Sequence, residues 1–179
     1  SASNNRPWQD RLPAQGTSMA DTAHFSIVLV DDEPAQRTVL AGYLRKKHHA
    51  IREAGSEAEA LKRIAQEPAD IILSDFKMPD RTGLDLLREV KKQQPETTVI
   101  IMTAFGTIED AVQSMREGAY DYLTKPVDLE ELDLLIQRIG ERQRLLSENR
   151  LLREQLVERY SFSGIVSQSP SMEAVLNTA

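Results

Sequence analysis

The sequence has no cysteine among its 179 residues. The chain therefore forms no disulfide bond, no cysteine-ligated zinc site and no thiol nucleophile, which fits a reducing compartment. It also has no apolar run close to the roughly 20 residues that cross a bilayer, and no signal-peptide core. We therefore expect a cytoplasmic protein that makes no use of a membrane.

Positive charge is also scarce, since 22 Lys and Arg face 28 Asp and Glu, for a net charge of −6. An acidic chain repels a phosphate backbone, so we do not expect this chain to bind nucleic acid directly. Its length accommodates one ordinary domain of about 100–150 residues together with extensions.

Five short apolar runs alternate with helical segments along the chain. The runs lie at 26–30, 50–54, 71–74, 98–103 and 120–124. The helices are predicted at 34–46, 56–67, 84–94 and 108–117. Ser56 and Glu59 form a capping-box pattern at the second helix, and Gly118 ends the fourth. Apolar strands joined by helices indicate an α/β protein with a parallel sheet that is covered on both faces.

Polar side chains stand where these strands end. Asp31 and Asp32 follow the first strand, and Asp75 follows the third. Thr103 ends the fourth strand and Lys125 follows the fifth. Because the carboxyl ends of parallel strands share one edge of the sheet, where ligands bind, we expect these side chains to lie together.

Three carboxylates at one edge repel one another, by roughly 4 kcal/mol for a pair about 4 Å apart at an effective dielectric near 20. A hard divalent cation removes that cost, and oxygen ligands suit Mg²⁺. Asp75 is the natural acceptor of a phosphoryl group, because carboxylates form aspartyl phosphates. The Lys125 ammonium and the Thr103 hydroxyl would stabilise the phosphoryl oxygens.

Each of these residues has a simpler interpretation when it is taken alone. Asp32 is suited to cap the following helix, and Asp75 is suited to an ordinary loop. Thr103 is a common strand residue, Lys125 belongs to a type that is usually solvated, and Tyr122 suits a core. Their joint occurrence at the ends of successive elements is what favours a site.

Four segments, LVDDEP, LSDFKMPDRTGLDLL, IIMTAFG and YDYLTKP, carry a family resemblance. In this order and spacing they resemble the receiver domain of two-component response regulators, over about residues 25–140. The resemblance implies a flavodoxin-like, doubly wound five-stranded sheet in the order 2-1-3-4-5. It also implies that a sensor histidine kinase donates a phosphoryl group to Asp75.

The same resemblance implies a Mg²⁺ site. Asp32 and Asp75 would bind the ion through their side chains, and Asp31 would act mainly through water. The main-chain carbonyl of Lys77 would supply a further ligand. The resemblance also implies a cis peptide bond between Lys125 and Pro126.

A phosphoryl site and a switch are implied as well. Thr103 and Lys125 would contact the phosphoryl oxygens, together with backbone N–H groups near Phe76 and Ala104. Tyr122 matches an aromatic residue that swings inward when Thr103 moves toward the phosphate. The expected function is therefore regulatory rather than enzymatic.

We predict four segments along the chain. Residues 1–18 lack hydrophobic periodicity and are interpreted as an expression-vector remnant, with a genuine disordered arm as the alternative. Residues 19–140 form the receiver domain, 141–160 a helical linker, and 161–179 the start of a further domain. This last stretch resembles the opening of the AAA+ ATPase domain of NtrC-type, sigma-54-dependent transcription activators.

The extended C-terminal helix carries a heptad pattern at Leu145, Asn149, Leu152 and Leu156. An Asn at such a position fixes the register of a coiled coil. Pairing with a second copy and a solvated linker remain open alternatives. With the receiver face, this helix predicts a homodimer.

Phosphorylation of Asp75 is expected to change the dimer geometry and so to control a downstream ATPase. The parent protein would bind DNA and sigma-54 RNA polymerase, while this chain lacks the G-x-x-x-x-G-K phosphate loop. A phosphohydrolase with an aspartyl nucleophile is one rival, but Lys77 stands where such enzymes commonly carry a second carboxylate. A degenerate receiver that only dimerises is the other rival, and the complete set of site residues argues against it.

Overall fold

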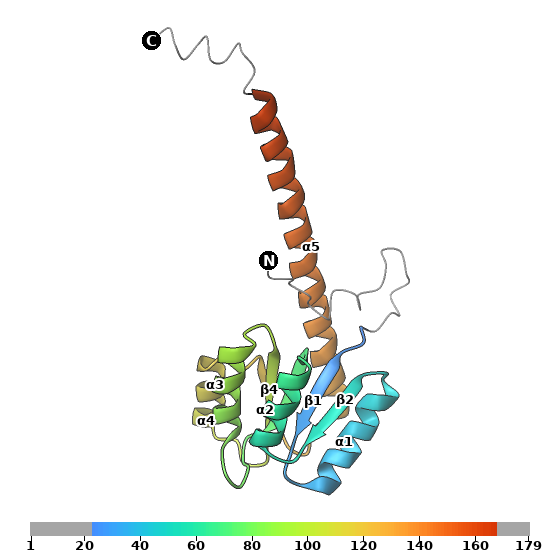
Figure 1. Ribbon diagram of the computed structural model, residues 1–179. Helices are drawn as coiled ribbons and strands as arrows, with labels where there is room; N and C mark the ends of the chain where they lie inside the picture. The colour runs from blue at the N-terminus through green and yellow to red at the C-terminus, as the bar shows by residue number, and fades with distance from the viewer. Residues whose placement is uncertain (1–22, 168–179) are drawn as a thin grey trace. The chain divides into compact units, whose positions relative to one another are not determined.

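The computed structural model describes residues 23–167 and is an α/β protein in which strands and helices alternate (Figure 1). The elements, in chain order, are β1 (Ser26–Val30), α1 (Pro34–Lys46), β2 (Ala50–Ala54), α2 (Glu57–Gln66), β3 (Ile71–Asp75), α3 (Gly83–Gln93), β4 (Thr98–Thr103), α4 (Ile108–Arg116), β5 (Asp121–Thr124) and α5 (Leu129–Ser167).

The five strands form one parallel sheet in the order β2-β1-β3-β4-β5. This confirms the predicted fold class and strand order. The order places β1 and β3 at the centre, so Asp31 and Asp75, which close these strands, come from adjacent positions in the sheet.

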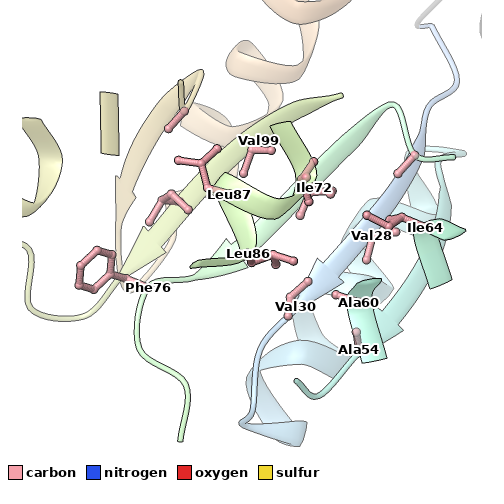
Figure 2. Packing of buried hydrophobic residues seen from close by; sticks show 14 residues of the cluster. Val28, Val30, Ala54, Ala60, Ile64, Ile72, Phe76, Leu86, Leu87 and Val99 are labelled. Atoms are coloured by element: carbon pink, nitrogen blue, oxygen red, sulfur yellow. The ribbon is translucent and has the colours of Figure 1, made fainter. Parts of the chain in front are cut away.

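Every residue of β1 is buried, which explains its uninterrupted apolar sequence. Alternate residues of a strand point to opposite faces, so both faces of the sheet require a cover. On one face, Val28 and Val30 pack with Ile72 and with residues of α2 and α3, as Figure 2 shows. Burial of each such side chain contributes about 1.5–3 kcal/mol, so this layer fixes the sheet beneath the site.

Four of the described helices begin with a side-chain cap; at α5, Asp128 Oδ1 accepts hydrogen bonds from the Glu130 and Glu131 N–H groups. Ser56 accepts a hydrogen bond from the Glu59 N–H, but the Glu59 carboxylate accepts from the Gly55 N–H instead of the Ser56 N–H. The predicted capping box of α2 is therefore only half formed. Complete boxes occur at α3, between Thr82 and Asp85, and at the start of α4.

The chain divides into a first unit that ends at Gln137 and a second that begins at Arg138, and α5 contributes to both. The helix continues to Ser167, beyond the predicted end near residue 160, because residues 161–167 contain no proline and Gly164 does not interrupt it. Residues 161–167 of the predicted ATPase segment are thus helical. The predicted vector remnant at 1–18 and residues 168–179 lie outside the described residues. Within residues 23–167, no helix combines the length and apolar character that crossing a bilayer demands.

Candidate functional site

The carboxyl edge of the sheet brings an ammonium group between two carboxylates. Lys125, which follows β5, places its Nζ 2.7 Å from Asp31 Oδ2 and 2.8 Å from Asp75 Oδ2. The partners lie 94 and 50 residues away along the chain. All three side chains are largely buried, so these ion pairs act in a medium that screens charge weakly.

A third carboxylate completes the cluster. Ligand oxygens of Asp31, Asp32 and Asp75 lie within 4.8 Å of one another, with Asp32 exposed and the other two buried. Three carboxylates and one ammonium leave an excess of negative charge. Oxygen donors at this spacing suit a hard cation such as Mg²⁺.

The ion pairs also control the charge of Lys125. Burial by itself lowers the pKa of Lys125, but hydrogen bonds to Asp31 and Asp75 more than offset that effect, and the pKa is raised overall. The side chain is therefore a fixed cation near neutral pH, as stabilisation of phosphoryl oxygens requires.

Local backbone contacts orient the two buried carboxylates. Asp31 Oδ1 accepts a hydrogen bond from the Glu33 N–H at 2.8 Å. Asp75 Oδ1 accepts from the Lys77 N–H at 3.2 Å, which leaves Oδ2 to Lys125. Helix α1 has Glu33 as its N-cap residue, so the alternative role of Asp32 as that cap is wrong.

The backbone donors differ from the expected pair at one position. The Phe76 N–H donates to the Met102 carbonyl at 2.7 Å and so continues the pairing of β3 with β4. It is not directed at the site, and the Lys77 N–H is the donor that lies beside the Asp75 carboxylate. Ala104 is exposed and lines the cavity at this edge.

Thr103 and Tyr122 lie next to this cluster. Thr103 is buried at the end of β4, and its Oγ1 accepts a hydrogen bond from the Phe105 N–H at 3.3 Å. Burial raises the pKa of Tyr122, and the Thr103 side chain opposes that shift. Among residues 23–167, however, no group makes a hydrogen bond of ordinary geometry with the buried Tyr122 hydroxyl. The peptide bond between Lys125 and Pro126 is cis, as the resemblance implies.

Gly83 is a site residue that the sequence reasoning missed. A Cβ atom at this position would lie 2.5 Å from the Asp75 carbonyl oxygen and 3.2 Å from the Phe76 Cα. Both are backbone atoms, which cannot rotate away. The signal was present, because glycine is a poor helix former and yet occupies the first position of α3.

The acidic cluster, Thr103 and Lys125 face one cavity of about 890 Å³. Its walls include all five polar residues predicted for this edge, together with apolar residues of α1 and of the segment after β5. The residues that line it include Asp31, Asp32, Asp75, Thr103, Ala104 and Lys125. A cavity of this volume has room for a group the size of a phosphate and a hydrated ion beside Asp75.

A family model for the response regulator receiver domain matches residues 27–137. The chain belongs to this family. Receiver domains are the phospho-accepting regulatory domains of two-component systems and interact with histidine kinases. They bind Mg²⁺ through an acidic cluster, which in this receiver is formed by Asp31, Asp32 and Asp75.

Several curated relatives of this receiver are named as transcriptional regulators. Regulatory protein AtoC of Escherichia coli (strain K12) is 35% identical over 151 residues, or 84% of this chain and 33% of the relative. DNA-binding transcriptional regulator NtrC of Azospirillum brasilense is 38% identical over 113 residues, or 63% of this chain and 24% of the relative. The chain thus spans about a third of the length of such relatives.

Solved structures agree with this assignment. A response regulator receiver domain protein from Clostridium thermocellum has a TM-score of 0.64 at 34% identity, and the match covers 68% of this chain and 98% of that one. NtrX from Brucella abortus has a TM-score of 0.67 at 35% identity, and the match covers 72% of this chain and 29% of that one. This receiver is therefore related to NtrC-family regulators.

The second unit, taken by itself, carries the predicted seam on α5. Leu145, Leu152 and Leu156 are 53%, 60% and 52% exposed, and Asn149 is exposed as well. Exposed leucines at this spacing form an apolar stripe that a single chain leaves uncovered.

Proposed function

We propose that this receiver accepts a phosphoryl group on Asp75 from a sensor histidine kinase and converts the added charge into a change of dimer geometry. The observation that carries the proposal is the Lys125 ammonium, which lies between the Asp75 and Asp31 carboxylates. A buried carboxylate held by one cation and one N–H keeps an oxygen lone pair for attack on phosphorus.

The phosphoryl group passes from the phosphohistidine to Asp75 in one displacement step. A carboxylate oxygen of Asp75 forms a bond to phosphorus while the bond from phosphorus to the phosphohistidine nitrogen breaks, and that nitrogen keeps the electron pair. Lys125 then exchanges its contact with Asp75 Oδ2 for a phosphoryl oxygen. The Thr103 hydroxyl donates a hydrogen bond to another phosphoryl oxygen, and the Lys77 N–H is positioned for a third contact. Such fixed donors supply most of what phosphoryl transfer requires.

The acidic cluster fits Mg²⁺ by its chemistry. Asp32 and Asp75 would bind the ion through their carboxylates, with Asp31 acting through water and Lys77 through its carbonyl. When bound, the ion neutralises charge on the phosphoryl group. Asp31 keeps its role of holding Lys125 in place.

The output of the switch would run through Thr103, Tyr122 and α5. A phosphoryl group adds about −1.5 to −2 charges at pH 7, which draws Thr103 and Lys125 toward it and lets Tyr122 repack. Helix α5 leads into the exposed leucine stripe, which would pair with a second copy and place the Asn149 side chains in register. In a parent protein related to NtrC-family activators, that pairing would control a sigma-54-interacting ATPase.

Intact-protein mass spectrometry tests the acceptor. The protein incubated with acetyl phosphate and Mg²⁺ should gain one phosphoryl group, and Asp75→Asn should abolish the gain. Asp70→Asn is the matched control, because Asp70 is also a buried carboxylate but lies at the opposite edge of the sheet. An adduct that survives Asp75→Asn, or no adduct on the unaltered protein, contradicts the proposal.

Sedimentation with and without beryllofluoride tests the dimer. Leu152→Lys, which charges the predicted seam, should weaken association. Leu151→Lys should not, because Leu151 is similarly exposed but lies off the seam. A chain that stays monomeric in both conditions, or equal effects of the two variants, contradicts pairing through this stripe.

A further inference from the structure

Gly106, in the loop between β4 and α4, lies directly against the Tyr122 ring. A Cβ atom at position 106 would overlap the Tyr122 hydroxyl oxygen and would lie 2.8 Å from Tyr122 Cε1. It would also lie 2.9 Å from Thr103 Cγ2. The space that a side chain would fill at Gly106 is thus the space that the Tyr122 ring uses.

Backbone conformation does not explain the glycine. Among residues 23–167, the only glycine with a positive φ is Gly118, at 101°. Gly106 therefore adopts a conformation that alanine also tolerates. What excludes a side chain at this position is the Tyr122 ring together with the Thr103 methyl group.

The Tyr122 ring is held by shape rather than by a polar contact. Its hydroxyl oxygen is fully buried, and no described residue gives it a hydrogen bond of ordinary geometry. The Thr103 side chain is close enough to oppose the rise in the Tyr122 pKa, but a hydroxyl with so poor a hydrogen bond contributes little to holding the ring. The observed position of the ring therefore depends on a good steric fit, and a methyl group at position 106 should displace it.

We propose that Gly106 is a positioning residue of the switch, the seat that admits the Tyr122 ring beside Thr103. Its role in signalling rests on the proposed phospho-switch, whereas the seat itself rests on the packing alone. Gly83 provides a contrast, because its close neighbours are backbone atoms. The atoms nearest Gly106 belong to the side chains of Tyr122 and Thr103, so Gly106→Ala should expel the Tyr122 ring and leave the Asp75 backbone and its contact with Lys125 in place.

Fluorine NMR on protein labelled with fluorotyrosine tests the seat. The chain has four tyrosines, and Tyr122→Phe identifies the resonance of Tyr122. In Gly106→Ala that resonance should move toward the resonance of Tyr160, whose residue is 75% exposed. Unchanged resonances of Tyr43 and Tyr120 would show that the domain is still folded.

Gly42→Ala is the matched control, because a Cβ atom at Gly42 would meet no atom within 4 Å. It should leave the Tyr122 resonance where it is. A Tyr122 resonance that stays in place in Gly106→Ala overturns the seat. In case Gly106→Ala impairs folding, the same change is made in a Tyr122→Ala background, where the loss of stability should largely disappear; an equal loss there also overturns the seat.

A second measurement separates the seat from the phospho-switch. Gly106→Ala treated with acetyl phosphate and Mg²⁺ should gain a phosphoryl group as the unaltered protein does, yet lose the change in sedimentation that beryllofluoride produces. If the unaltered protein gains no phosphoryl group, the proposed function fails while the NMR result still decides the seat. If both proteins gain it and the sedimentation change survives in Gly106→Ala, the signalling role of the seat is wrong.

Discussion

The two edges of the sheet both bury polar side chains, but they satisfy them differently. At the carboxyl edge, Asp31 and Asp75 are paired with the Lys125 ammonium, a charged side chain from another strand. At the amino edge, Asp70 accepts the Ser26 N–H at 2.7 Å. At the carboxyl edge a side-chain cation thus shares the two carboxylates with backbone N–H groups, whereas Asp70 binds the backbone of the neighbouring strand directly.

Two more residues follow the pattern of the amino edge. His49 Nδ1 accepts the Phe25 N–H at 3.2 Å, and the two rings stack. Thr97 Oγ1 donates to the Ala69 carbonyl at 2.8 Å. A backbone partner holds the ends of strands together and stays in place, whereas a side-chain cation is free to exchange its partner for a ligand. The identity of the partner, more than burial, separates the site from the scaffold.

The largest expected effect is that of Lys125→Met. Removing the ammonium leaves two buried carboxylates unpaired, which costs about 3 kcal/mol of unfolding free energy. Urea denaturation in the presence of a chelator should show this loss, and Mg²⁺ should restore part of it. Lys92→Met is the control, since Lys92 forms an exposed ion pair with Glu89. If Lys125→Met and Lys92→Met are equally stable, the buried ion pairs of Lys125 contribute no more than an exposed ion pair. The contrast between the two edges would then be wrong.

Gly83→Ala should follow, with a loss of about 2 kcal/mol, because the new methyl group would press on the Asp75 carbonyl and cannot be relieved by side-chain rotation. The rate of phosphorylation by acetyl phosphate should fall as well, since Asp75 moves with its backbone. Gly42→Ala, on the open face of a helix, should instead gain about 0.5–1 kcal/mol. If Gly83→Ala and Gly42→Ala change the free energy of unfolding alike, the close contact of α3 with the Asp75 backbone does not limit the residue at position 83.

The amino edge should respond to acid through His49. Burial lowers the pKa of His49, the neighbours His24, His48 and Lys47 act in the same direction, and Asp133 opposes them. A histidine with a lowered folded-state pKa stabilises the protein fully above its unfolded value of about 6.5, and the contribution is lost as pH falls below that value.

We therefore expect the free energy of unfolding to drop between about pH 7.5 and about pH 5.5. The drop should shrink in His49→Phe, which cannot be protonated, and persist in His48→Asn at the exposed neighbour. Urea titrations at the two pH values measure it. The same pH slope in His49→Phe and in the unaltered protein would remove His49 from this account.

The smallest expected effect is that of Thr97→Val, which removes one buried hydrogen bond to the backbone and should cost about 1 kcal/mol. Thr98→Val, at the half-buried neighbouring position, is the control. Phosphorylation of Asp75 should be unchanged in both variants, as measured by intact mass. A lowered phosphorylation rate in Thr97→Val would show that the amino edge is not merely a scaffold.

Local sequence patterns predicted the helices and strands, and they missed helix caps where the capping pattern was defined too narrowly. The apolar runs and the turn residues between them predicted the five strands, because each signal lies within a few neighbouring residues, whereas the order of the strands came from the family resemblance. The complete capping boxes at Thr82 and Thr107 were missed because Asp85 and Asp110, rather than Glu or Gln, return the second hydrogen bond. Both capping boxes could therefore have been predicted from the local sequence.

What the sequence by itself determined is the set of groups at the carboxyl edge: Asp31, Asp32, Asp75, Thr103 and Lys125. The parallel order of apolar strands brings their ends together whatever the details of packing.

Only the tertiary structure decided which side chains and backbone groups at and around this edge touch. It joined Lys125 to Asp31 and Asp75, turned the Phe76 N–H toward Met102, and set the Tyr122 ring against Gly106. The physical reason is that contacts between distant segments depend on strand register and on the space that neighbouring side chains leave, and neither is written in any one stretch of the chain.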